Sequence, residues 1–156
     1  KLSALGMGCM RLPTIDGDSN KIDIYKSRQM VEYALKNGVN YIDTAWGYHG
    51  GNSELVMGQI LKDYPRDSFY LASKFPGFDF KNLQNIPEIF EKQLEKCQVE
   101  YFDYYMLHNL QNVQDFKKTY EEKRLTFPNR ITPSRITLRI WTMKIISRSM
   151  FVSSLL

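Results

Sequence analysis

Four ionisable residues in the first 110 positions could together transfer a proton to a carbonyl group. Asp43, Lys74 and His108 each follow a short apolar run, and Tyr48 lies in the glycine-containing loop 46–51, just beyond Asp43. A free phenol has a pKa of about 10, too high for efficient proton transfer at neutral pH, and a neighbouring ammonium group favours the phenolate. The set therefore predicts carbonyl reduction with Tyr48 as the general acid.

The other three residues have complementary roles in this reaction. Lys74 would tune the Tyr48 phenol, and Asp43 would hold the lysine charged and in place. His108 would donate a hydrogen bond that orients the carbonyl oxygen, or relay a proton. Taken singly, each of these residue types at a strand end is more often a turn, solvated or packed residue. The prediction therefore requires all four side chains to meet at one rim of one sheet.

The elements that would position these residues alternate between apolar runs and helical patterns. We expect strands within 2–10 and at 39–43, 69–73 and 102–107, and helices at 23–36, from 52 or 53 to about 62, and at 86–96. Such alternation favours parallel strands joined by crossover helices, an α/β fold whose catalytic groups lie at the carboxyl ends of the strands. The pattern alone does not distinguish a barrel from a doubly wound sheet.

The composition changes sharply towards the carboxyl end of the chain. All nine glycines lie at or before Gly77. Residues 1–116 carry 12 basic and 15 acidic side chains, whereas residues 117–156 carry 9 and 2. We therefore predict two segments: an α/β unit at 1–110 and an irregular basic tail at 111–156. Our hypothesis is that the sequence after about residue 116 arises from a frameshift, an aberrant gene model or a remodelled terminus.

The composition also argues against several kinds of protein. No run of 18 apolar residues occurs, so we expect no membrane span. Two cysteines, Cys9 and Cys97, cannot form a disulfide framework or a four-thiolate metal site. We expect both thiols to be buried, no metal, and a cytoplasmic location.

Several segments resemble the opening half of aldo-keto reductases. The similar segments are 6–13 (GMGCMRLP), 40–48 (NYIDTAWGY), 72–74 (ASK) and 105–108 (YMLH). The order Asp, Tyr, Lys, His also matches, over about residues 1–110. The resemblance is greatest to a bacterial subgroup whose longer members carry a carboxyl-terminal iron–sulfur domain, although this chain lacks the cysteines for that cluster. It implies the first half of a (β/α)8 TIM barrel, with NADP as cofactor and aldehydes or ketones as substrates.

The resemblance also implies where the cofactor would bind. In this family the second half of the barrel holds most of it, and the first half offers the loop after the first strand. The candidates here are Cys9, Met10, Arg11 and Asp43. A closed barrel needs about 250 residues, and no motif of the second half follows His108. The expectation is a truncated reductase domain, which leaves open whether this chain binds cofactor or is active.

Three other functions compete with this one. A non-catalytic half-barrel would self-associate through its exposed sheet edges or bind a protein partner. Lys74 could instead form a Schiff base in a TIM-barrel aldolase. The tail could bind nucleic acid or a membrane surface, but its basic residues do not share one helical face, and we expect neither partner. Those residues are Arg135, Arg139, Lys144 and Arg148.

Overall fold

The computed structural model describes residues 1–109 and residue 114. These residues form a four-stranded sheet in which neighbouring strands are parallel and follow one another in chain order. The strands are β1 (Gly6–Gly8), β2 (Tyr41–Asp43), β3 (Tyr70–Phe75) and β4 (Tyr104–Leu107). The prediction of about four parallel strands is confirmed.

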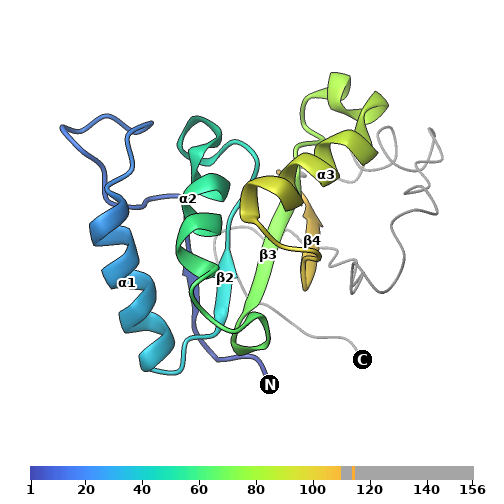
Figure 1. Cartoon of the computed structure of the whole chain (residues 1–156). Coiled ribbons are helices and arrows are strands. Elements are labelled where there is room, and N and C mark those ends of the chain that lie inside the picture. Colours follow the sequence, from blue (N-terminus) through green and yellow to red (C-terminus); the bar gives the residue numbers. More distant parts are fainter. Residues whose placement is uncertain (110–113, 115–156) are drawn as a thin grey trace.

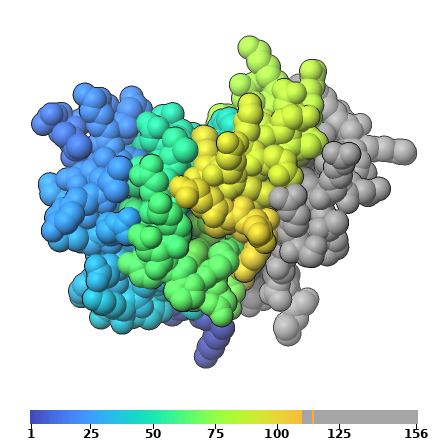
Figure 2. Space-filling model, viewed as in Figure 1, coloured from blue at the N-terminus to red at the C-terminus, as the bar shows by residue number. Residues whose placement is uncertain are grey.

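The helices show which of the two α/β architectures the chain adopts. The three α-helices are α1 (Ile24–Lys36), α2 (Asn52–Leu61) and α3 (Ile86–Cys97). They lie side by side on one face of the sheet (Figure 1), and they cover that face in the space-filling view (Figure 2). A doubly wound sheet has helices on both faces and a reversal of strand order, whereas a barrel has neither. The fold is therefore that of one half of a TIM-barrel wall.

Local sequence signals explain where the helices begin and end. The Asp23 carboxylate accepts a hydrogen bond from the Lys26 N–H (3.0 Å) and caps the amino end of α1. At its carboxyl end, Gly38 takes a positive φ of 82° that glycine tolerates without strain. Pro87 lies in the first turn of α3, where its missing N–H costs no helical hydrogen bond.

The core fills the space between the sheet and the helices. Phe90 of α3 packs edge-on against Phe102 and Tyr105, with ring centroids 5.9 and 4.9 Å away. Val31 of α1 is fully buried, whereas its neighbour Met30 is 44% exposed. The helix α1, which lies at the end of the helical layer (Figure 1), therefore buries only a narrow stripe of its surface.

The alternation of side chains along β3 determines which face carries the predicted site. Ser73 points towards the helices, since its hydroxyl donates to Glu54 of α2. Lys74 therefore points to the opposite face, which is the interior in a closed barrel. Asp43 lies on that same face, because its carboxylate pairs with the Lys74 ammonium.

The segment predicted to be an irregular basic tail, 111–156, lies outside the described residues apart from Gln114. In the part of the chain that is described, no helix has the length and apolarity needed to span a bilayer. The same part contains no group of three or more side chains suited to hold a metal ion.

Candidate active site

An ion pair between Lys74 and Asp43 lies at the carboxyl ends of β2 and β3. The Lys74 Nζ atom is 2.5 Å from Asp43 Oδ1 and 2.8 Å from the carbonyl oxygen of Thr44. Both side chains are largely shielded, at 14% and 25% exposed. Shielding from solvent strengthens such a pair relative to one at the surface. The ammonium is therefore held at a fixed position by two oxygen atoms.

Tyr48 extends over this ion pair from the loop that follows β2. Its backbone N–H donates to the carbonyl of Ala45 (3.2 Å), which bends the chain back over the end of the strand. The Lys74 Nζ atom lies 4.7 Å from the centroid of the Tyr48 ring. At this distance the cation and the aromatic ring attract each other.

His108 completes the group from the end of β4. Its backbone N–H donates to the carbonyl of Phe75 (3.0 Å), which continues the β3–β4 pairing by one step. Its ring meets Tyr48 edge-on, with centroids 5.6 Å apart and planes at 85°, and Phe78 in the same way at 5.4 Å. The structure thus places all four predicted side chains together at one rim, while their catalytic roles stay a prediction.

The protonation of His108 follows from these surroundings. Burial lowers the pKa of its imidazole, the Lys74 ammonium lowers it further, and the Asp43 carboxylate opposes both effects in part. The neutral ring is therefore favoured at neutral pH. Its Nδ1 atom is buried and has no hydrogen-bond partner among residues 1–109.

Comparison with known proteins shows which family has a sequence similar to this chain. Residues 4–125 match the model of the Aldo/keto reductase family, and the matched region ends within the segment predicted as tail. The chain belongs to the aldo/keto reductase family.

Two curated relatives and one solved structure illustrate the match. "Probable aldo-keto reductase 1" of Glycine max is 29% identical over 154 residues, which cover 89% of this chain and 44% of that protein. The "NADH-specific methylglyoxal reductase" of Escherichia coli is 32% identical over 127 residues, covering 69% of this chain and 38% of that protein. An aldo-keto reductase from Klebsiella pneumoniae, solved in complex with NADPH, superposes with a TM-score of 0.62 at 21% identity. That superposition covers 87% of this chain and 44% of the other. The chain thus spans less than half the length of each of these aldo-keto reductases.

The loop after β1 contains the residues predicted to contact a cofactor. The backbone N–H of Cys9 donates to the carbonyl of Asp43 (2.8 Å), which places this loop beside the ion pair. The Cys9 thiol itself is fully buried, and burial raises its pKa to about 12. Its side chain is therefore a neutral packing group, as is expected of a buried cysteine. Met10 and Arg11 are exposed and free to contact a bound molecule.

His49, which the sequence did not single out, holds the Tyr48 loop in place. Its backbone is left-handed, with φ of 54°, an uncommon conformation outside glycine. The Nε2 atom accepts a hydrogen bond from the Leu12 N–H (3.0 Å), so the proton lies on Nδ1, which donates to the carbonyl of Ser19 (2.6 Å). The ring thereby ties the Tyr48 loop to the loop after β1.

A buried polar cluster behind β3 was also not predicted. The carboxylate of Glu54 is fully buried, and its Oε1 atom accepts from the Ser73 hydroxyl (2.7 Å) and from Gln93 Nε2 (2.5 Å). Burial raises the pKa of Glu54, whereas the hydrogen bonds from Ser73 and Gln93 and the nearby Lys96 ammonium lower it. A single acidic residue within the apolar segment 52–61 was the available sequence signal.

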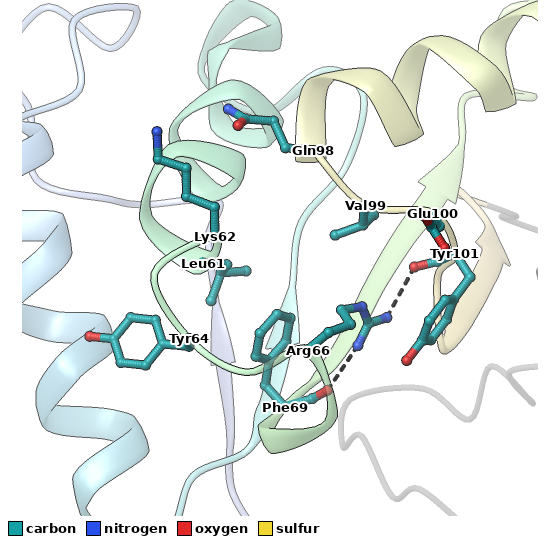
Figure 3. A pocket seen from close by; sticks show the side chains of 9 residues that line it. All are labelled: Leu61, Lys62, Tyr64, Arg66, Phe69, Gln98, Val99, Glu100 and Tyr101. Carbon is teal, nitrogen blue, oxygen red and sulfur yellow. Dashed lines mark hydrogen bonds between the residues drawn. The ribbon is translucent and has the colours of Figure 1, made fainter.

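A cavity of about 310 Å³ lies away from the ion pair. It is situated between the carboxyl ends of α2 and α3 and the start of β3 (Figure 3). Here the Arg66 guanidinium donates to the carbonyls of Phe69 (3.1 Å) and Tyr101 (3.0 Å) and pairs with Asp103. In TIM barrels this end of the strands contributes to stability, whereas catalysis occurs at the carboxyl ends. We therefore assign Arg66 a structural role.

Proposed function

We propose that this chain carries the proton-donating half of an NADPH-dependent reductase that acts on an aldehyde or ketone. The observation that supports it is the position of the Lys74 ammonium, which is paired with Asp43 and lies under the Tyr48 ring. A phenol next to a fixed cation can release its proton, because the ammonium stabilises the phenolate that remains. Tyr48 would thus act as the general acid.

The remaining groups arrange and support that proton transfer. Asp43 and the Thr44 carbonyl hold the ammonium in place, so it needs no rearrangement when negative charge appears on the Tyr48 oxygen. The neutral His108 ring carries one N–H, which would donate to the carbonyl oxygen and orient it. The proton then passes from the Tyr48 hydroxyl to that oxygen. When bound, a nicotinamide cofactor supplies the hydride for the carbonyl carbon.

Two features of this end of the sheet fit a bound molecule. The buried Nδ1 atom of His108 has no partner in the described part of the chain, and Met10 and Arg11 are exposed on the loop beside Asp43. Met10, Arg11, Asp43 and the backbone at Cys9 would contact the cofactor from this side. We propose NADPH because the family includes a solved NADPH complex, although one relative is named for NADH. Buried, unpaired cysteines fit the cytoplasmic location that we also propose.

The test is a fluorescence titration of the full chain with NADPH, followed by addition of an aldehyde while NADPH absorbance is recorded. We expect saturable binding and aldehyde-dependent loss of NADPH, with NADH as the comparison. Absence of binding at millimolar cofactor would overturn the proposal for this chain. Borohydride trapping with the same aldehyde tests the aldolase alternative, which the structure disfavours because the Lys74 ammonium already donates to two oxygens.

A second candidate function is a half-barrel that associates with another copy of itself. Its basis is the sheet, in which the four described strands, β1 to β4, do not close into a barrel. Light scattering after size-exclusion chromatography would detect a dimer. A monomer that binds NADPH would exclude this alternative in favour of the reductase.

A further inference from the structure

Lys96, at the carboxyl end of α3, reaches across to the loop that carries Tyr48. Its Nζ atom donates to the carbonyl of Gly51 (3.2 Å) and lies 4.2 Å from the centroid of the Trp46 ring. These two contacts fall on either side of Tyr48 in the sequence. One ammonium group therefore holds both arms of the segment 46–51.

The position of this ammonium is fixed in turn by a buried carboxylate. Lys96 Nζ is 3.6 Å from Glu54 Oε2, an atom that is buried and has no hydrogen-bond partner among the described residues. The Lys96 side chain is 22% exposed and that of Glu54 is fully buried. A buried carboxylate is costly unless a cation compensates it, so the pair constrains where Lys96 can lie.

The other carboxylate oxygen of Glu54 is connected by hydrogen bonds to β3, the strand that carries Lys74. Glu54 Oε1 accepts from Ser73 and Gln93, and Gln93 Nε2 is also 3.2 Å from the backbone carbonyl of Lys74. A continuous set of contacts thus runs from the Tyr48 loop through Lys96, Glu54 and Gln93 to β3. It joins the backbones that present the phenol and the ammonium.

The packing of α2 against α3 favours the same arrangement. A Cβ atom at Gly58 would lie 2.3 Å from the backbone oxygen of Lys96 and 2.8 Å from the carbonyl carbon of Cys97. Glycine at this position therefore allows α2 to approach the last turn of α3 closely. That approach lets the Lys96 side chain reach Glu54 in the first turn of α2.

We propose that Lys96, held by Glu54, is a positioning residue that sets the placement of the Tyr48 loop relative to Lys74. The proposal rests on the function proposed above, because the placement matters only if Tyr48 delivers the proton. Lys96 itself touches neither the Tyr48 hydroxyl nor the Lys74 ammonium in any described contact, and it acts through Trp46 and Gly51.

The test compares amide hydrogen exchange in the full-length wild type and in Lys96→Met, which keeps most of the aliphatic stem but removes the charge. We expect exchange across 46–51 to become roughly 10- to 100-fold faster, the loss expected for one charge-assisted hydrogen bond. Exchange in α1 should stay unchanged. Lys96→Arg, whose guanidinium can pair with Glu54 and stack on Trp46, should restore slow exchange. Lys92→Met, an exposed lysine on the same helix, is the matched control.

A second variant covers the case in which Lys96→Met leaves a buried charge unpaired and fails to fold. The double variant Glu54→Gln with Lys96→Met removes both charges, and we expect the same local increase in exchange. Wild-type exchange at 46–51 in a folded variant would overturn the proposal. So would an equal increase throughout the described part of the chain.

Kinetics give a further readout that separates this proposal from the function on which it rests. If the wild type reduces an aldehyde, Lys96→Met should lower kcat about 10-fold with KM nearly unchanged, and Lys96→Arg should recover it. An unchanged kcat would overturn the positioning role. If the wild type shows no reduction, the proposed function fails, and the exchange data still show whether Lys96 holds the loop.

Discussion

The Lys74 ammonium contacts three groups that differ in charge and chemistry. It pairs with the Asp43 carboxylate at 2.5 Å, donates to the carbonyl oxygen of Thr44 at 2.8 Å, and lies 4.7 Å from the Tyr48 ring centroid. The carboxylate balances the charge of the cation, so the ammonium can be shielded from water next to a phenol. The Tyr48 ring therefore lies next to a charge-balanced cation whose position is fixed.

Replacing Lys74 by Met tests this arrangement. We expect kcat for carbonyl reduction to fall by about 10²-fold or more, in the range seen when one charge-stabilising group is removed. The affinity for NADPH should change little, since the ammonium faces the phenol. Lys81→Met, an exposed lysine on the surface, should leave kcat unchanged. A Lys74→Met variant with wild-type kcat would show that the cation has no part in proton transfer.

The protonation of His108 should appear in the pH dependence of stability. Burial lowers the pKa of its imidazole in the folded chain below the ordinary 6.5, so the unfolded chain takes up this proton first as pH falls. Stability is therefore fully present above about pH 6.5 and is lost as pH falls through that value towards the folded-state pKa. Urea unfolding midpoints at about pH 7.5 and about pH 5.5 should differ more for the wild type than for His108→Asn. Equal differences in both proteins would contradict this assignment.

At the scale of the secondary-structure elements, the register of the strands and the close packing of the helices determine where the site residues lie. Asp43 pairs with Ala72 across the sheet, and Lys74, two residues further on, pairs with Met106. The predicted strand at 69–73 is in fact Tyr70–Phe75, so Lys74 lies inside β3 and not just after it. The boundary shifted because Phe75 continues the apolar alternation and its carbonyl bonds to His108.

Gly58 offers a test of the packing between α2 and α3. Gly58→Ala would force a Cβ atom against the backbone of Lys96, which cannot move as a flexible side chain can. We expect a loss of about 1–3 kcal/mol in the free energy of unfolding, typical of an overpacked contact. Gly47→Ala is the control, because nothing lies within 4 Å of its Cβ position, and its effect should be within about 0.5 kcal/mol. Similar stability of the two variants by urea unfolding would contradict the close approach.

The sequence predicted the four residues of the site because each one has a local signal. Asp43, Lys74 and His108 follow apolar runs, and Tyr48 lies in a glycine-containing loop directly after one of them. His49 and Lys96 have no such signal, since their partners are distant in the chain: His49 contacts Leu12, and Lys96 contacts Gly51. Contacts of that kind depend on how loops and helices meet in space, which periodicity does not specify.

At the scale of the whole molecule, the sequence predicted the alternation of strands and helices because each βα unit has a local pattern of apolar residues. The sequence did not distinguish a barrel wall from a doubly wound sheet, since that distinction depends on which face of the sheet each helix covers. The helices α1, α2 and α3 lie on one face of the sheet (Figure 1), and Asp43 and Lys74 form their ion pair on the other. The chain spans 44% of the Glycine max relative, and the four strands in its described part form an open sheet and not a closed barrel.

Substitution of Tyr48 by Phe is the measurement that separates a working proton donor from a packed aromatic ring. The variant keeps the ring beside Lys74 and His108 and removes only the hydroxyl. In NADPH-dependent aldehyde reduction by the full chain, we expect the rate to fall about 10²- to 10⁴-fold with cofactor affinity unchanged. Tyr33→Phe, at an exposed position on α1, should retain the full rate. Reduction by Tyr48→Phe at the wild-type rate would contradict the proposed role of Tyr48, and a wild type without any reduction would contradict the proposed activity.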